Sequence, residues 1–184
     1  MRWFSAIALA LCVLGAQTPA GADQRDPRLA VLFDQLKLAP DPQVANVVAH
    51  TIWSIWGQAD DDAVQILLHD GVAAMARQDL RGALGKFNQI IAIAPAFAEG
   101  WNKRATVYYL MGRYKESLAD IERTLALEPR HFGALSGRGL VYMELEDEDL
   151  ALESFEEALE VYPLMPGAAR NAEILRNRLG RKDI

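Results

Sequence analysis

The sequence is poor in the residues from which disulfides, metal centres and nucleic-acid interfaces are built. Among 184 residues there are one cysteine and three histidines. An intrachain disulfide and a thiolate metal cluster are therefore excluded. Lysine and arginine number 19 against 25 acidic residues, for a net charge of −6. Phosphate backbones repel such a chain, so a broad nucleic-acid interface is excluded. Ordinary glycine and proline contents and 51% hydrophobic residues exclude wholesale disorder and indicate one or two compact domains.

Motifs of enzyme chemistry are also missing from the sequence. It contains no nucleophile elbow, phosphate-binding loop, zinc-protease motif or dinucleotide-binding glycines. His50, His69 and His131 lack metal-ligand spacing. The acidic run 60–62 lacks the alternating oxygens and the glycine of a calcium loop, and we expect it to cap a helix that begins near Ala63. We therefore expect no catalytic residue, no metal and no cofactor, and predict that the protein is not an enzyme.

The segment 1–22 has the order of a secretory signal peptide. Arg2 supplies positive charge, residues 3–15 are almost entirely apolar, and residues 16–22 are mostly small. Cleavage is expected after Ala22, which predicts a periplasmic or secreted protein without stable membrane insertion. The apolar run is shorter than the ~20 residues of a spanning helix, although a retained anchor is the alternative. Cleavage would remove Cys12, which suits an oxidising compartment.

The rest of the chain repeats with one fixed period. Pro95, Pro129 and Pro163 lie 34 apart, and other columns of like residues follow the same period. One column is always small (Gly71, Ala105, Gly139) and another always large (Phe87, Ile121, Phe155). Apolar residues at helical spacing predict two helices per copy, and the prolines fall where the second helix has stopped. Such a hairpin cannot bury its apolar face alone, so neighbouring hairpins must stack.

The middle copy shows the pattern most fully, in Trp101, Ala105, Tyr108, Gly112, Tyr114, Ser117, Ile121 and Pro129. This order resembles the tetratricopeptide repeat (TPR). Arg104 and Arg138 replace the family's leucine, and Thr124 replaces a usual alanine. The resemblance covers three copies, 64–97, 98–131 and 132–165. It implies an all-α fold: an α-solenoid of antiparallel helix hairpins in a right-handed superhelix, of the short, signal-bearing bacterial type.

Two flanking segments complete the predicted solenoid. Residues 23–63 read as a hairpin of two helices, from Pro27 to about residue 38 and from about 43 to 57. They are either a degenerate fourth repeat or an unrelated cap, and Trp53 and Trp56 are expected to pack on the next hairpin. Residues 166–184 read as a C-terminal capping helix and tail. The inner face of that helix is expected to carry Ala169, Ala172, Leu175 and Leu179.

The resemblance also implies a partner-binding groove lined by the first helix of each hairpin. Carried onto this sequence, the family's ligand-contacting positions are Leu68, Val72, Met75, Asn102, Thr106, Tyr109, Ser136, Leu140 and Met143. They form a largely apolar trough without the lysine and asparagine set with which some relatives hold a peptide's C-terminal carboxylate. Residues 144–160 carry nine carboxylates. They are either a solvated face, partly paired with the basic cap helix, or a surface that steers a basic partner.

These observations predict a non-enzymatic protein-binding adaptor or scaffold of the bacterial cell envelope. Its partner is a protein or peptide of unknown identity. Two alternatives stay open: a self-associating structural module, and an accessory subunit of an envelope enzyme complex.

Overall fold

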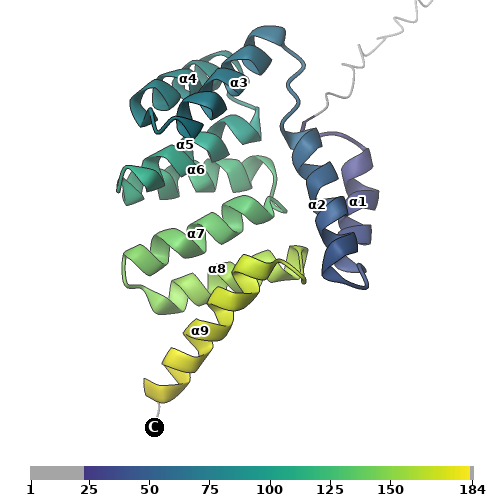
Figure 1. Cartoon of the computed structure of the whole chain (residues 1–184), viewed down its shortest axis with the longest axis vertical. Coiled ribbons are helices and arrows are strands. Elements are labelled where there is room, and N and C mark those ends of the chain that lie inside the picture. The colour runs from purple at the N-terminus through teal and green to yellow at the C-terminus, as the bar shows by residue number, and fades with distance from the viewer. Residues whose placement is uncertain (1–22, 183–184) are drawn as a thin grey trace, which may run out of the picture.

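The computed structural model describes residues 23–182, which form nine α-helices and no strand (Figure 1). The helices are α1 (Arg28–Lys37), α2 (Pro42–Trp56), α3 (Asp62–Ala76), α4 (Leu80–Ile93), α5 (Ala98–Leu110), α6 (Tyr114–Leu127), α7 (Phe132–Glu144), α8 (Glu148–Val161) and α9 (Pro166–Lys182). The all-α prediction is confirmed. The predicted signal peptide lies outside the described residues.

Helices α3 to α8 form three antiparallel hairpins that stack in chain order, and α9 follows α8 (Figure 1). The same backbone device turns each hairpin. Gln78, Gly112 and Glu146, which hold the same position in the three repeats, have φ of 62°, 71° and 62°. In the first and third hairpins the next residue, Asp79 or Asp147, then caps the second helix by accepting a backbone N–H with its carboxylate.

Within each hairpin the small column faces the large column. A Cβ placed on Gly71 would come 2.6 Å from the ring of Phe87, and one on Gly139 would come 2.7 Å from the ring of Phe155. The middle hairpin carries Ala105 here, opposite the smaller Ile121. An extra methyl on one helix is therefore matched by a smaller side chain on the other, which keeps the two helices close.

Small residues also sit where successive hairpins stack. A Cβ on Gly100 of α5 would come 2.7 Å from Ile90 of α4, and Ala134 and Ala168 are buried at the same place in the next two copies. The cap α9 buries Ala168, Ala172 and Leu175 completely. Ala169 is exposed, so its expected inner position is wrong. The stacking register places the preceding alanine, Ala168, against α8.

The N-terminal hairpin is placed where the sequence did not predict. Helices α1 and α2 pack on each other and lie beside the stack instead of extending it, with α1 against α8 (Figure 1). Their core is continuous with Phe132, the first residue of α7, and with Tyr162, which directly follows α8. The expectation that Trp53 and Trp56 pack on the following hairpin is wrong. Both rings lie against His131 and Phe132, with ring centres 4.1 to 5.4 Å apart.

Between residues 23 and 182, no helix combines the length and the apolar character that crossing a bilayer requires.

Candidate partner-binding groove

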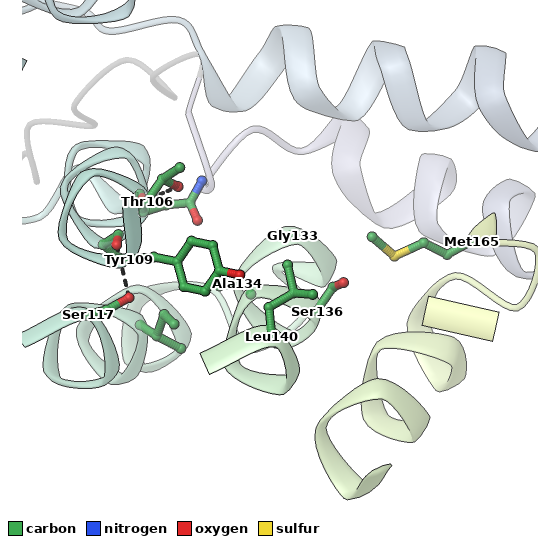
Figure 2. A pocket seen from close by; sticks show the side chains of 12 residues that line it. Thr106, Tyr109, Ser117, Gly133, Ala134, Ser136, Leu140 and Met165 are labelled. Carbon is green, nitrogen blue, oxygen red and sulfur yellow. Dashed lines mark hydrogen bonds between the residues drawn. The ribbon is translucent and has the colours of Figure 1, made fainter. Parts of the chain in front are cut away.

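The helices α5 and α7, each the first of its hairpin, border a pocket of about 190 Å³ to which α6 contributes Ser117 and Ile121 (Figure 2). The pocket is lined by Asn102, Ala105, Thr106, Tyr109, Ser117, Ile121, Gly133, Ala134, Ser136, Gly137, Leu140 and Met165. Five of the nine residues predicted for the groove are in this lining: Asn102, Thr106, Tyr109, Ser136 and Leu140. Their role in binding a partner stays a prediction.

The other four predicted groove residues lie elsewhere. Leu68 is 5% exposed and belongs to the core between α3 and α4, so it offers no groove surface. Met75 packs against the same core, whereas Val72 of α3 is 43% exposed. Met143 lines a separate hollow together with Arg178 of α9.

The lining is largely apolar, and several of its polar side chains bond within the protein. The Ser117 hydroxyl donates to the Ala105 carbonyl at 2.9 Å, and the Thr106 hydroxyl donates to the Asn102 carbonyl at 3.0 Å. The Asn102 amide in turn donates to Glu99 at 2.8 Å. Figure 2 shows the Tyr109 ring reaching from α5 toward Leu140 of α7. The pocket therefore presents mainly hydrocarbon to an incoming group.

A carboxylate lies at the Tyr109 end of the pocket. The Tyr109 hydroxyl lies 3.4 Å from Glu144, and the Tyr114 hydroxyl donates to the second oxygen of Glu144 at 2.9 Å. Partial burial, with Glu144 nearby, raises the pKa of Tyr109 above its ordinary value. The hydrogen bond to Glu144 is the main reason that the pKa of Tyr114 is raised. Both phenols thus stay protonated and hold the carboxylate in place.

The N-terminal hairpin borders the groove near the beginning of α7. A Cβ on Gly133 would come 2.5 Å from the Trp53 ring, so glycine is needed for this close approach. The Lys103 ammonium of α5 lies 5.2 Å from the centre of the same ring. Met165, which lines the pocket, also packs against the core of the hairpin. Trp53 and Met165 therefore connect the hairpin to the groove.

A largely buried polar cluster of Glu99, Lys103 and His131 lies where the N-terminal hairpin meets the start of α7. This cluster was not predicted from the sequence. His131, to which the sequence analysis assigned no role, is fully buried and stacks on Trp56 with ring centres 4.1 Å apart. Its Nδ1 accepts the backbone N–H of Ala134, so Nε2 carries the proton and donates to Glu99 at 3.2 Å. The signal that could have found it is its place before α7, where a residue able to accept a hydrogen bond caps a helix.

Glu99 is the charge at the centre of this cluster. Its side chain is 3% exposed and pairs with Lys103 at 2.8 Å. Burial on its own raises the pKa of Glu99, but Lys103 and the hydrogen bond from His131 together outweigh it, so that the pKa lies below its ordinary value. Glu99 is therefore an ionised, paired carboxylate that joins α5 to the start of α7.

Several other acidic residues have structural partners. Asp61 caps α3, as interpreted from the run 60–62, by accepting the N–H groups of Ala63 and Val64. Three acids of the run 144–160 pair with arginines: Glu148 with Arg178, Glu156 with Arg176, and Glu157 with Arg138. Among residues 23–182, His, Cys, Asp and Glu nowhere gather in threes in a way that could hold a metal ion.

A stack of helical hairpins with a pocket on its first helices defines the protein as an α-solenoid of the repeat class. A family model for the tetratricopeptide repeat matches residues 102–170. A TPR repeat-containing protein of Rhizobium etli is 36% identical over 152 residues, which are 83% of this chain and 74% of the relative. The chain belongs to the tetratricopeptide repeat family, whose members are generally non-catalytic binding modules.

Solved structures agree with this assignment. The TPR domain of Sgt2 from Aspergillus fumigatus superimposes with a TM-score of 0.64 at 25% identity, covering 68% of this chain and 84% of that domain. The first TPR of Spaghetti (RPAP3), solved with the HSP90 peptide SRMEEVD, superimposes with a TM-score of 0.63 at 19% identity, covering 66% and 97%. The second likeness concerns the fold alone.

Proposed function

We propose that this protein is a non-enzymatic adaptor of the bacterial cell envelope that binds a segment of a partner protein in the groove on α5 and α7. The observation that carries the proposal is the apolar pocket that gathers Thr106, Tyr109, Ser136 and Leu140. A half-exposed aromatic ring beside an aliphatic side chain in a concave site is the kind of surface on which binding energy concentrates.

The family supports a protein or peptide as the ligand. The RPAP3 repeat domain was solved with a peptide of HSP90, so a domain of this fold can bind a short segment. The pocket here is of the size of one or two side chains, too small for a folded domain to enter. We infer that a partner contributes a linear or helical segment, anchored by a side chain in the pocket.

A photo-reactive amino acid at Leu140 tests the groove. Crosslinking in the native envelope should capture a discrete partner from this position, whereas the same group at Glu122, exposed on α6, should capture little. The variant Ser136→Trp fills the pocket and should abolish capture from position 140 without lowering the melting temperature. Equal capture from both positions would contradict the groove as the partner-binding surface. A product of twice the chain mass would instead identify self-association.

The envelope location is part of the proposal and rests on the segment 1–22. If this segment is a signal peptide cleaved after Ala22, the exported protein begins at Asp23. Intact mass of the protein recovered from the periplasmic fraction measures this directly. A product that retains Met1 or Cys12 would contradict it.

A further inference from the structure

The groove joins an apolar pocket to one carboxylate, and this combination specifies a ligand chemistry. We propose that the partner segment carries an aliphatic or aromatic anchor, which enters the pocket, and a nearby lysine or arginine, which pairs with Glu144. The inference rests on the proposed function and adds to it the class of segment that is bound.

The pocket has room for an apolar anchor. A cavity of roughly 150 Å³ lined by aliphatic and aromatic groups holds a benzene ring. The pocket here is about 190 Å³ and opens on one side. Because the Ser117, Thr106 and Asn102 side chains already donate within the protein, a polar anchor would find few free donors there. An apolar side chain would lose no hydrogen bond on entering.

Glu144 is available to a cation. In the part of the chain that the structure describes, its oxygens accept from Tyr109 and Tyr114 and no basic side chain pairs with it. A carboxylate has about four acceptor positions, so two neutral phenols leave room for a further donor. The phenols also hold the carboxylate in one orientation, which lowers the entropy that an incoming lysine or arginine must lose. Several other acids of the run 144–160 already have an arginine, which distinguishes Glu144 from them.

The groove offers little to an acidic segment. No lysine or arginine lines the pocket. Lys103, which follows the lining residue Asn102, is held by Glu99 at 2.8 Å and lies over the Trp53 ring. The net charge of −6 favours approach of a basic segment over an acidic one.

The spacing between anchor and cation follows from the geometry. Tyr109 lines the pocket with its ring and reaches Glu144 with its hydroxyl, so one tyrosine side chain separates the two subsites. An extended chain advances about 3.4 Å per residue. The basic residue should therefore lie within about three positions of the anchor.

An unbiased peptide selection tests the inference. The probe is a phage library of random dodecapeptides, panned on the immobilised protein. We expect enriched sequences to place lysine or arginine within a few residues of a leucine, isoleucine, phenylalanine or tryptophan. Binding of a recovered peptide, followed by fluorescence anisotropy, should weaken about fivefold in Glu144→Gln. The matched control is Glu153→Gln, an exposed carboxylate on α8 apart from the Tyr109 and Tyr114 hydroxyls that hold Glu144, and it should change little.

The outcomes separate this inference from the proposed function. One outcome is a set of peptides that lose binding to the Leu140→Arg variant and yet are acidic, or bind the Glu144→Gln and Glu153→Gln variants equally well. Such peptides would overturn the proposed pairing of a basic residue with Glu144, while the groove would remain the binding site. If every recovered peptide binds the Leu140→Arg variant as tightly as the wild type, both the proposed function and this inference would be overturned. Peptides that depend on Leu140 and Glu144 together would support both.

Discussion

The ring of Phe155 on α8 occupies the space into which any side chain at Gly139 of α7 would point. A Cβ at Gly139 would come 2.7 Å from one ring carbon and within 3 Å of two more. The third hairpin thus depends on the absence of a single methyl group. The middle hairpin reaches the same helix pairing with Ala105 opposite Ile121.

We expect Gly139→Ala to destabilise the protein by roughly 1–3 kcal/mol, because Phe155 is fully buried and cannot move aside. The matched control is Gly85→Ala on α4, where a Cβ would meet nothing within 4 Å. There alanine should stabilise by about 0.5–1 kcal/mol. Urea unfolding of both variants measures the difference.

The pairing of Ala105 with Ile121 in the middle hairpin suggests a second substitution that should offset Gly139→Ala in the third hairpin. Phe155→Ile combined with Gly139→Ala should cost less than the two single costs added together, with a coupling of about 0.5–3 kcal/mol. Strictly additive losses would mean that these two residues do not set the helix separation.

The positive φ at the hairpin turns predicts that glycine at such a turn position increases the stability of the protein. Glu146 has φ of 62°, a conformation that costs a non-glycine residue roughly 1–2 kcal/mol. Glu146→Gly should therefore stabilise the protein by up to about 1 kcal/mol, and Gly112→Ala should destabilise it by a similar amount. Glu146→Ala separates the charge from the backbone effect, since it removes the carboxylate and keeps the strain. If Glu146→Ala stabilises as much as Glu146→Gly, the gain is electrostatic.

The stacking of Trp56 on His131 predicts that the N-terminal hairpin unfolds locally when this contact is removed. Trp56 is 1% exposed, so Trp56→Ala should cost roughly 3–5 kcal/mol. Hydrogen exchange should then rise first in α1 and α2, while α3 to α6 keep their protection. Trp101→Ala is the comparison, because Trp101 is only half-buried beside Arg104 and Arg123, away from the hairpin. A uniform rise in exchange along the chain would show that the hairpin is not a separate unit.

Glu99 predicts an acid-dependent loss of stability. Its pKa in the folded protein is lowered, so the folded state binds fewer protons than the unfolded chain as the pH falls. The stabilisation is complete above the unfolded pKa of about 4.3 and disappears as the pH drops through the lower folded-state value. Glu99→Gln should be less stable at neutral pH and lose less on acidification. Glu122→Gln, an exposed acid on α6, should follow the wild-type pH profile closely. Parallel profiles for Glu99→Gln and the wild type would contradict this account.

The sequence alone was sufficient for the repeating part of the molecule. The 34-residue period identified the columns through Gly139 and Phe155, which meet between paired helices, and Asp61 was correctly interpreted as a helix cap. These features depend on contacts within one hairpin or one turn, where the helical period decides which side chains share a face. The groove positions of α5 and α7 came from the resemblance to the tetratricopeptide repeat, and five of those residues line one pocket. Their role in binding a partner stays a prediction.

Only the tertiary structure decided where the N-terminal hairpin lies and what surrounds His131. Trp53 and Trp56 could have packed on any apolar surface within reach. The sequence does not show whether that surface is α3 or the segments that lead into α7 and α9. The choice depends on contacts such as that of the Tyr162 hydroxyl with Asn46, at 2.8 Å across 116 residues of sequence. Such contacts leave no periodic signal, because each is made once, between segments whose separation is set only when the whole stack has formed.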